Sequence, residues 1–192
     1  MRFRLMFEGE IRPRMKAGLP HIHQIRQAFH PQLKRLWGHP PLSEMQTEWL
    51  RAPDPADTTD HKSYRRIETV GGKSYAPLIS HHLGAELDII FLRQQAKGQL
   101  IGEGGDIDNR LKTLFDALRK PSKSEVQTLG QETESDEEPL HCLLRDDALI
   151  HRVNVETDRL LKDAPPNALV VIVNVKVVIT RPTFQTLSFV VD

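Results

Sequence analysis

The residues best suited to chemistry are acids in the second half of the chain. Asp106 and Asp108 are separated by one isoleucine, and a second acidic pair, Asp146 and Asp147, follows further along. Residues two apart in an extended segment point to the same side, so Asp106 and Asp108 would carry two neighbouring carboxylates. Such carboxylates repel each other unless a cation lies between them. Hard oxygen ligands of this kind suit Mg²⁺, with Mn²⁺ as the alternative.

A lysine lies at helical spacing from these acids. Lys112 follows Asp108 by one turn on the same face of a predicted helix, where it could neutralise charge on a phosphate oxygen or orient an attacking water. Asp116 lies one turn further, and we interpret it as a structural partner of Lys112. Of Asp146 and Asp147, only one can face inward from the strand that they precede. We therefore expect one of the two to bind the metal.

The acidic motif also has an ordinary interpretation. An Asp-x-Asp-Asn sequence before a helix is common in caps and turns, and Asp108 or Asn109 would serve as such a cap. Taken alone, the motif is therefore weak support for a metal site. Its combination with Lys112, an amphipathic helix and the later Asp146-Asp147 pair is more specific.

The hydrophobic pattern predicts the elements that position these residues. Strands are expected at 2–11, 73–79, 85–93, 148–157 and 168–179, with a further one at 184–191, and helices at 21–37 and 109–119, with a short helix near 44–50. The near-continuous Val and Ile of 168–179 favour a central position in the sheet. The segment 122–139 is polar and acidic, which predicts a disordered or surface insertion. We expect one domain spanning 1–192, of α/β (α+β) class, with a small mixed sheet packed by helices.

Composition limits the class of protein. The chain has 192 residues, 39% of them hydrophobic, and balanced charge. Residues 1–40 carry eight basic and two acidic side chains, whereas 121–147 carry two basic and eight acidic ones. This asymmetry suggests a polyanionic partner, although such charges also simply solvate a surface. The single cysteine, the missing signal-peptide pattern and the short apolar runs favour a cytoplasmic protein without a membrane partner.

The acidic motif resembles that of a known nuclease family. Residues 105–118 read Gly-Asp-Ile-Asp-Asn-Arg-Leu-Lys-Thr-Leu-Phe-Asp-Ala-Leu, and residues 144–150 read Leu-Arg-Asp-Asp-Ala-Leu-Ile. Both stretches are similar to the RusA family of Holliday junction resolvases. The resemblance implies a dimeric, Mg²⁺-dependent endonuclease that nicks four-way DNA junctions symmetrically in recombination and repair. It implies that Asp106, Asp108 and Asp147 bind the metal, with Asp146 as an alternative, and that Lys112 is the catalytic lysine.

The chain departs from the family pattern in two places. An acidic insertion separates the helix from the Asp146-Asp147 pair, and residues 12–80 have no counterpart that we can align. Metal-dependent hydrolysis is therefore better supported than junction specificity. Two alternatives stay open: a nuclease of another specificity, for flaps, RNA or other branched DNA, and a non-cleaving nucleic-acid-binding or regulatory protein on the same scaffold.

Overall fold

The structure is a computed structural model, and it describes residues 1–51, 66–94, 107–130, 138–165, 167–183 and 186–189. Its strands are β1 (Arg2–Gly9), β2 (Glu68–Val70), β3 (Lys73–Ile79), β4 (Leu83–Arg93), β5 (Leu140–Leu144), β6 (Ile150–Arg159) and β7 (Leu169–Ile179). Its helices are α1 (Arg14–Leu36), α2 (Leu42–Trp49), α4 (Ile107–Leu118) and α5 (Lys123–Leu129), with short 3-10 helices η3 (Asp147–Leu149) and η4 (Leu187–Phe189). The predicted mixed class, with sheets packed by helices, is confirmed.

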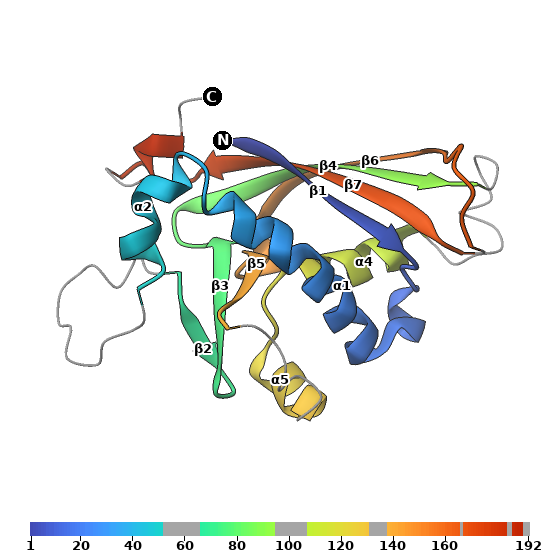
Figure 1. Ribbon diagram of the computed structural model, residues 1–192, viewed down its shortest axis with the longest axis horizontal. Helices are drawn as coiled ribbons and strands as arrows, with labels where there is room; N and C mark the ends of the chain where they lie inside the picture. The colour runs from blue at the N-terminus through green and yellow to red at the C-terminus, as the bar shows by residue number, and fades with distance from the viewer. Residues whose placement is uncertain (52–65, 95–106, 131–137, 166, 184–185, 190–192) are drawn as a thin grey trace.

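Two mixed sheets form the framework. The larger has the strand order β1-β7-β4-β6, in which β4 and β6 are parallel and the other neighbours are antiparallel. The smaller has the order β2-β3-β5. Helices α1 and α4 lie on one side of the larger sheet (Figure 1). Strand β7 lies between β1 and β4, which confirms the central position expected from its continuous Val and Ile residues.

The core forms between the larger sheet and helix α1. In β1, Leu5 is buried whereas Arg4 and Met6 are exposed, as the alternating pattern predicts. Helix α1 begins earlier than the predicted 21–37, because Arg14–Ala17 already form a helical turn that is joined to the rest across a kink. The kink is at Gly18, whose φ of 61° lies in the left-handed region that favours glycine.

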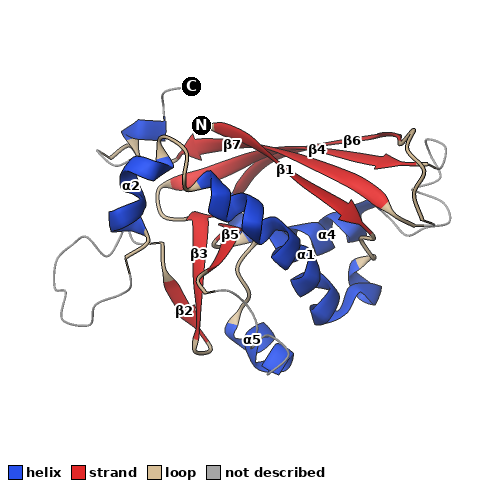
Figure 2. Ribbon diagram, viewed as in Figure 1, coloured by secondary structure: helices blue, strands red, loops and turns tan. Residues whose placement is uncertain are grey.

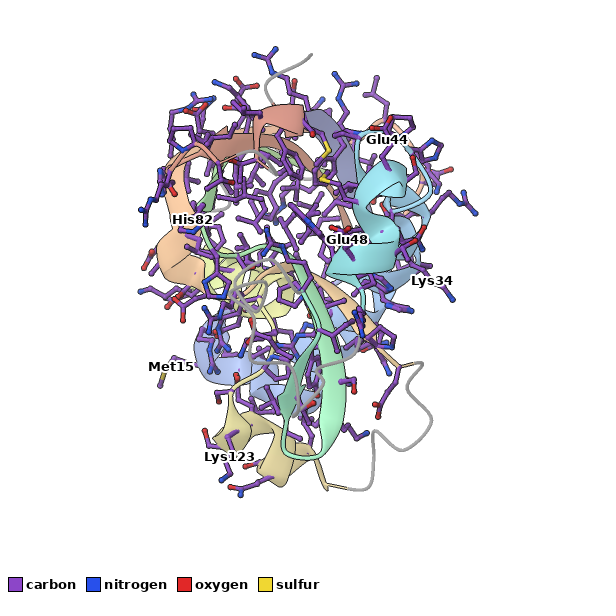
Figure 3. The ribbon with its side chains drawn as sticks, turned by 90° about the vertical axis from the view of Figure 1, so that its left-hand side faces the viewer. Met15, Lys34, Glu44, Glu48, His82 and Lys123 are labelled. Atoms are coloured by element: carbon purple, nitrogen blue, oxygen red, sulfur yellow. The ribbon has the colours of Figure 1, made fainter. Side chains whose placement is uncertain are left out.

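The sequence-based prediction missed several elements. Strands β2 and β5 were not predicted, and β5 is buried along its whole length. In the predicted tail strand at 184–191, Leu187–Phe189 instead form the 3-10 helix η4, and residues 184–185 and 190–191 lie outside the described residues. The expected short helix near 44–50 is confirmed as α2, in the upper part of Figure 3 around the labelled Glu44 and Glu48.

The predicted disordered insertion at 122–139 is wrong for its first half. Ser122 and Glu125 form a capping box, in which the Ser122 hydroxyl accepts from the Glu125 amide and the Glu125 carboxylate accepts from the Ser122 amide. Helix α5 follows and buries Val126 and Leu129. Val126 packs in a small cluster with Tyr75 of β3 and residues of β5. Residues 131–137 lie outside the described residues.

An ion pair ties α5 to the end of α4. Both carboxylate oxygens of Glu125 accept hydrogen bonds from the Arg119 guanidinium, at 2.8 and 2.9 Å. Burial alone would raise the pKa of Glu125, but the hydrogen bonds from Arg119 and Ser122 outweigh it and lower the pKa to about 2. Because the folded-state pKa lies below the ordinary value of 4.5, the pair stabilises the fold above pH 4.5 and loses this contribution as pH falls towards 2.

We therefore expect Glu125→Gln to lower the free energy of unfolding at pH 7 by roughly 2 kcal/mol. The difference from the wild type should shrink as pH falls below 4.5. Urea unfolding at pH 7 and at pH 3 measures both values. Glu44→Gln, in the exposed first turn of α2, is the matched control and should change neither. An unchanged unfolding free energy for Glu125→Gln at pH 7 would show that α5 is not held by this ion pair.

Candidate active site

The predicted acid and lysine of helix α4 form an ion pair in the first turns of this helix. The Lys112 ammonium donates to the Asp108 carboxylate at 2.6 Å, and both side chains are more than half exposed. This is the one-turn spacing that the sequence predicts. Asp106 lies outside the described residues, so its position relative to this pair stays a prediction. Helix α4 begins at Ile107, which places Asp108 in its first turn.

Buried hydrogen bonds fix α4 along its length. Near its N-terminal end, the Thr113 hydroxyl donates to the Arg12 carbonyl at 2.8 Å, and Arg110 donates to the Ile11 carbonyl. At the other end, the guanidinium of Arg26 from α1 donates to the carbonyls of Asp116 and Arg119, at 2.6 and 2.9 Å. The last carbonyls of a helix have no partner within the helix, so Arg26 supplies the missing donors.

Asp116 has a structural role, but with other partners than we expected. We interpreted it as a partner of Lys112. In the structure its carboxylate pairs with Arg14 from the start of α1 and with Arg119 at 2.6 Å. Arg119 also binds Glu125, so one guanidinium lies between two carboxylates. The Asp108-Lys112-Asp116 row therefore continues into an ion-pair network that joins α1, α4 and α5.

The two acids of the second pair differ: Asp146 caps a helix, and Asp147 has an exposed side chain. Asp146 precedes η3, and its carboxylate accepts from the Ala148 amide at 2.9 Å. Asp147 is the first residue of η3, and its side chain is exposed. The cap occupies Asp146, which favours Asp147 as the acid available to a metal. The start of β6, which follows η3, packs closely on β4, because a Cβ on Gly84 of β4 would come within 2.7 Å of the His151 ring.

A cleft of about 340 Å³ connects these two parts of the chain. It is lined by acids and bases from the end of α4 and from the segment before η3: Asp116, Arg119, Lys120, Pro121, Ser122, Arg145, Asp146 and Asp147. Asp116 and Asp147 therefore face one shared space. Asp108 and Lys112, in the first turns of α4, are not among the residues that line this cleft.

The cleft contains cations that the sequence-based prediction did not assign. Lys120 and Arg145 both bind Glu68 of β2, at 3.3 and 3.0 Å. Arg145 also contacts the ring of His81 at 3.2 Å. Burial, together with the charges of Arg145 and Arg66, lowers the pKa of His81. The position of Arg145 beside Asp146 was visible in the sequence, but its approach to β2 depends on the pairing of β3 with β5.

The basic residues of the N-terminal forty are not gathered on one surface. Arg2 and Arg4 line a hollow of about 530 Å³ on the sheet face opposite α1, with Lys176 and Arg152. Arg26 is 2% exposed. Arg14 contacts the cleft through the Asp116 carboxylate, and the buried Arg26 reaches it only through the backbone of Asp116 and Arg119. The predicted polyanion surface at 1–40 is therefore divided between separate regions of the molecule.

The donors present suit Mg²⁺ better than a softer metal. The charged oxygen donors at the row and the cleft are carboxylates, which magnesium prefers. Within the described ranges, no group of three or more His, Cys, Asp or Glu side chains lies close enough to hold a metal ion. The third predicted ligand, Asp106, lies outside these ranges. Asp108 and Asp147 are the described residues that would bind the ion, through carboxylate oxygens.

Because Asp146 caps η3 and Asp147 does not, we expect mutation of the two acids to affect the free energy of unfolding differently. Asp146→Ala removes the cap of η3, so it should lower the free energy of unfolding by roughly 0.5–1 kcal/mol. Asp147→Ala removes an exposed carboxylate that does not cap η3, so it should leave this free energy within error of the wild type. Urea unfolding compares the two. A larger loss for Asp147→Ala would reverse the assignment.

Comparison of the chain with family models, with curated proteins and with solved structures finds no match. Within the described residues, no helix is long and apolar enough to cross a membrane. The resemblance of residues 105–118 and 144–150 to the RusA family therefore rests on the motif residues themselves.

Proposed function

We propose that this protein is a Mg²⁺-dependent endonuclease that hydrolyses phosphodiester bonds in branched DNA, the four-way junction among them. The observation that carries the proposal is the Asp108-Lys112-Asp116 row on α4, which ends in a cleft shared with Asp147. Asp147, an acid suited to phosphodiester hydrolysis, thus lies beside Lys120 and Arg145, cations that can bind phosphate. Asp106, Asp108 and Asp147 would hold the ion, with Asp146 as the alternative and Mn²⁺ as an alternative metal.

The side chains have distinct roles in this proposal. When bound, the ion supplies Lewis-acid stabilisation of phosphate charge and an activated water. Lys112 is paired with Asp108 at 2.6 Å, and we propose that its ammonium turns to the phosphate oxygen on which negative charge builds. The pair holds Lys112 beside Asp108 before DNA arrives. Arg14 and Arg119 bind Asp116 and so keep this carboxylate apart from the other acids.

The cations of the cleft would position the DNA backbone. Lys120 and Arg145 lie on the same cleft as Asp147, and Glu68 holds both. Arginine binds a phosphate through two parallel N–H groups, and lysine binds it as a point charge. We propose that a phosphate next to the scissile one binds Arg145, which is 42% exposed, whereas Lys120 is 17% exposed and mainly anchors Glu68.

The junction preference and the dimer rest on the family resemblance. Two sites related by a two-fold axis would match the two opposed strands that a resolvase cuts. A role in recombination or repair is implied by the same resemblance, and the proposed cytoplasmic location comes from the composition. A nuclease for other branched nucleic acids and a non-cleaving binding protein are the alternatives, and the cleavage assay below separates them.

We expect the wild type to nick labelled four-way junctions in Mg²⁺ but not in EDTA, and to cut linear duplex more slowly. Asp108→Asn, Asp147→Asn and Lys112→Ala should each lower the cleavage rate at least about a hundredfold, with the melting temperature and DNA binding retained. Asp163→Asn, an exposed acid beyond β6, is the matched control and should cut at the wild-type rate. Normal cutting by Asp108→Asn or Asp147→Asn would disprove the site. Equal rates on linear duplex and junctions would indicate a general nuclease, and binding without cutting would indicate the regulatory alternative.

The proposed phosphate contact predicts a change in salt dependence. Arg145→Ala should weaken junction binding, measured in EDTA so that the proposed Mg²⁺-dependent cleavage is prevented. It should also reduce the slope of log K against log salt by about one phosphate contact. Arg35→Ala, at the exposed C-terminal end of α1, is the control and should leave the slope unchanged. Fluorescence anisotropy at several salt concentrations measures both. An unchanged slope for Arg145→Ala would place the phosphate contact elsewhere.

A further inference from the structure

Strand β6 forms an edge of the larger sheet with an open side. Among the described strands, β6 pairs with β4 alone and ends the order β1-β7-β4-β6. At the opposite edge, some of the outward backbone groups of β1 are already hydrogen-bonded. The Gln32 side chain of α1 accepts from the Met6 amide at 2.9 Å and donates to the Met6 carbonyl at 2.7 Å. This side chain occupies backbone groups that a further strand would need.

The side chains of β6 are more exposed than those of its neighbour on the same sheet face. Leu87 and Ile89 of β4 are buried, with 0% and 1% exposure. Their Cα partners on β6 are Val153 and Val155, which point to the same side of the sheet. Val153 is 40% exposed and Val155 is half-buried. The core-facing side of β6 therefore presents Val153, which the described part of the chain leaves exposed, beside Val155, which packs partly against the core.

The order of charges on β6 fits a second copy of the same strand. Charges often protect an edge strand because they repel an approaching strand. On β6 the two signs instead lie at equal distances from Asn154. In an antiparallel pair centred on Asn154, Arg152 lies opposite Glu156 of the other copy, and Val153 lies opposite Val155. Each such pair occurs twice because of the two-fold symmetry.

The neighbouring registers are less favourable. In a two-fold antiparallel pair, the core-facing residues of both strands must lie on the same side of the sheet. The symmetry axis must therefore pass through a residue, so the neighbouring registers are centred one residue away. A centre at Val153 would place Glu156 opposite Ile150 and His151 opposite Val155. A centre at Val155 would place Arg152 opposite Asp158, but it would also place Val153 opposite Thr157 and His151 opposite Arg159. The register centred on Asn154 is therefore the one that places Arg152 opposite an acid and both valines opposite valines.

Arg152 is already held in a position that suits this pairing. Its guanidinium lies 3.3 Å from Asp88 and 3.5 Å from Glu86 of β4, on the outer sheet face, and it remains 52% exposed. Glu156 is exposed and lies on the same outer face, two positions beyond Asn154. In the paired strands Arg152 would lie between Asp88 of its own chain and Glu156 of the second copy.

We propose that two copies of this chain associate through antiparallel pairing of their β6 strands about Asn154, which joins the two four-stranded sheets into one continuous sheet. Backbone hydrogen bonds along the ladder supply affinity, and the Arg152–Glu156 and Val153–Val155 pairs fix the register. The proposal specifies the partner surface of the proposed dimer. It rests on the proposed function only for its biological purpose, and its tests do not use cleavage.

A single cysteine at the symmetry centre tests the register. Paired residues in an antiparallel ladder have Cα atoms about 4.5–5.5 Å apart, within the range that a disulfide bridges. The native Cys142 is 1% exposed, so it should not form intermolecular bonds in the folded protein. We expect Asn154→Cys to give a covalent dimer under a mild oxidant, at a rate at least about tenfold above that of Arg4→Cys on the exposed face of β1. Equal rates for the two variants would overturn the proposal.

Charge reversal tests the pairing without a crosslink. Glu156→Lys should place like charges opposite each other at both Arg152 positions and raise the dimer dissociation constant at least about tenfold. Glu48→Lys, on the exposed side of α2 (Figure 3), is the matched control and should leave the constant unchanged. Mixing Glu156→Lys with Arg152→Glu should restore association, because each lysine then meets a glutamate.

Light scattering and sedimentation measure the assembly of these variants. A wild type that stays monomeric, or a Glu156→Lys variant that dimerises like the wild type, would overturn the interface whether or not the protein cuts DNA. A β6-linked dimer that cuts no nucleic acid would overturn the proposed nuclease and leave the interface in place.

Discussion

The position of helix α4 depends on one buried guanidinium. Arg26 of α1 donates to the last carbonyls of α4, and burial lowers the pKa of its guanidinium. A buried charge is costly unless it is hydrogen-bonded, so Arg26 and the end of α4 stabilise each other. The row of Asp108, Lys112 and Asp116 lies on this helix, so its place against η3 is set at the C-terminal end of α4, at the backbone of Asp116 and Arg119. Figure 2 shows α4 beneath the sheet, beside α1.

The elements that the sequence predicted best are those with strong periodicity. β4 and β7 are rich in apolar residues with only a few polar interruptions, and both were found close to their expected bounds. Helix α5 was missed because its residues are mostly polar. Its signal was a short one, the serine and glutamate of the capping box at Ser122 and Glu125. β5 was missed because its five residues follow an acidic segment and depend on parallel pairing with β3, which is far away in sequence.

The same distinction applies to the candidate site. The spacing of Asp108 and Lys112 is local to one helix, so the pair was predictable, and its 2.6 Å contact agrees with the expected face. The partners of Asp116 were not predictable, because Arg14 is brought to it by the packing of α1 on α4. The division between Asp146 and Asp147 also needed the structure, since it depends on whether η3 uses the first acid as its cap.

The central claim is that Asp108 and Asp147, with Asp106, hold a catalytic divalent ion. The most direct test is a titration of the DNA-free protein with Mn²⁺, in which the electron paramagnetic resonance signal of the free ion measures how much Mn²⁺ stays unbound. The account predicts saturable binding by the wild type, weakened by roughly tenfold or more in both Asp108→Asn and Asp147→Asn. The Asp163→Asn control should bind as the wild type does. Equal Mn²⁺ affinity in the wild type and in both site variants would contradict the account.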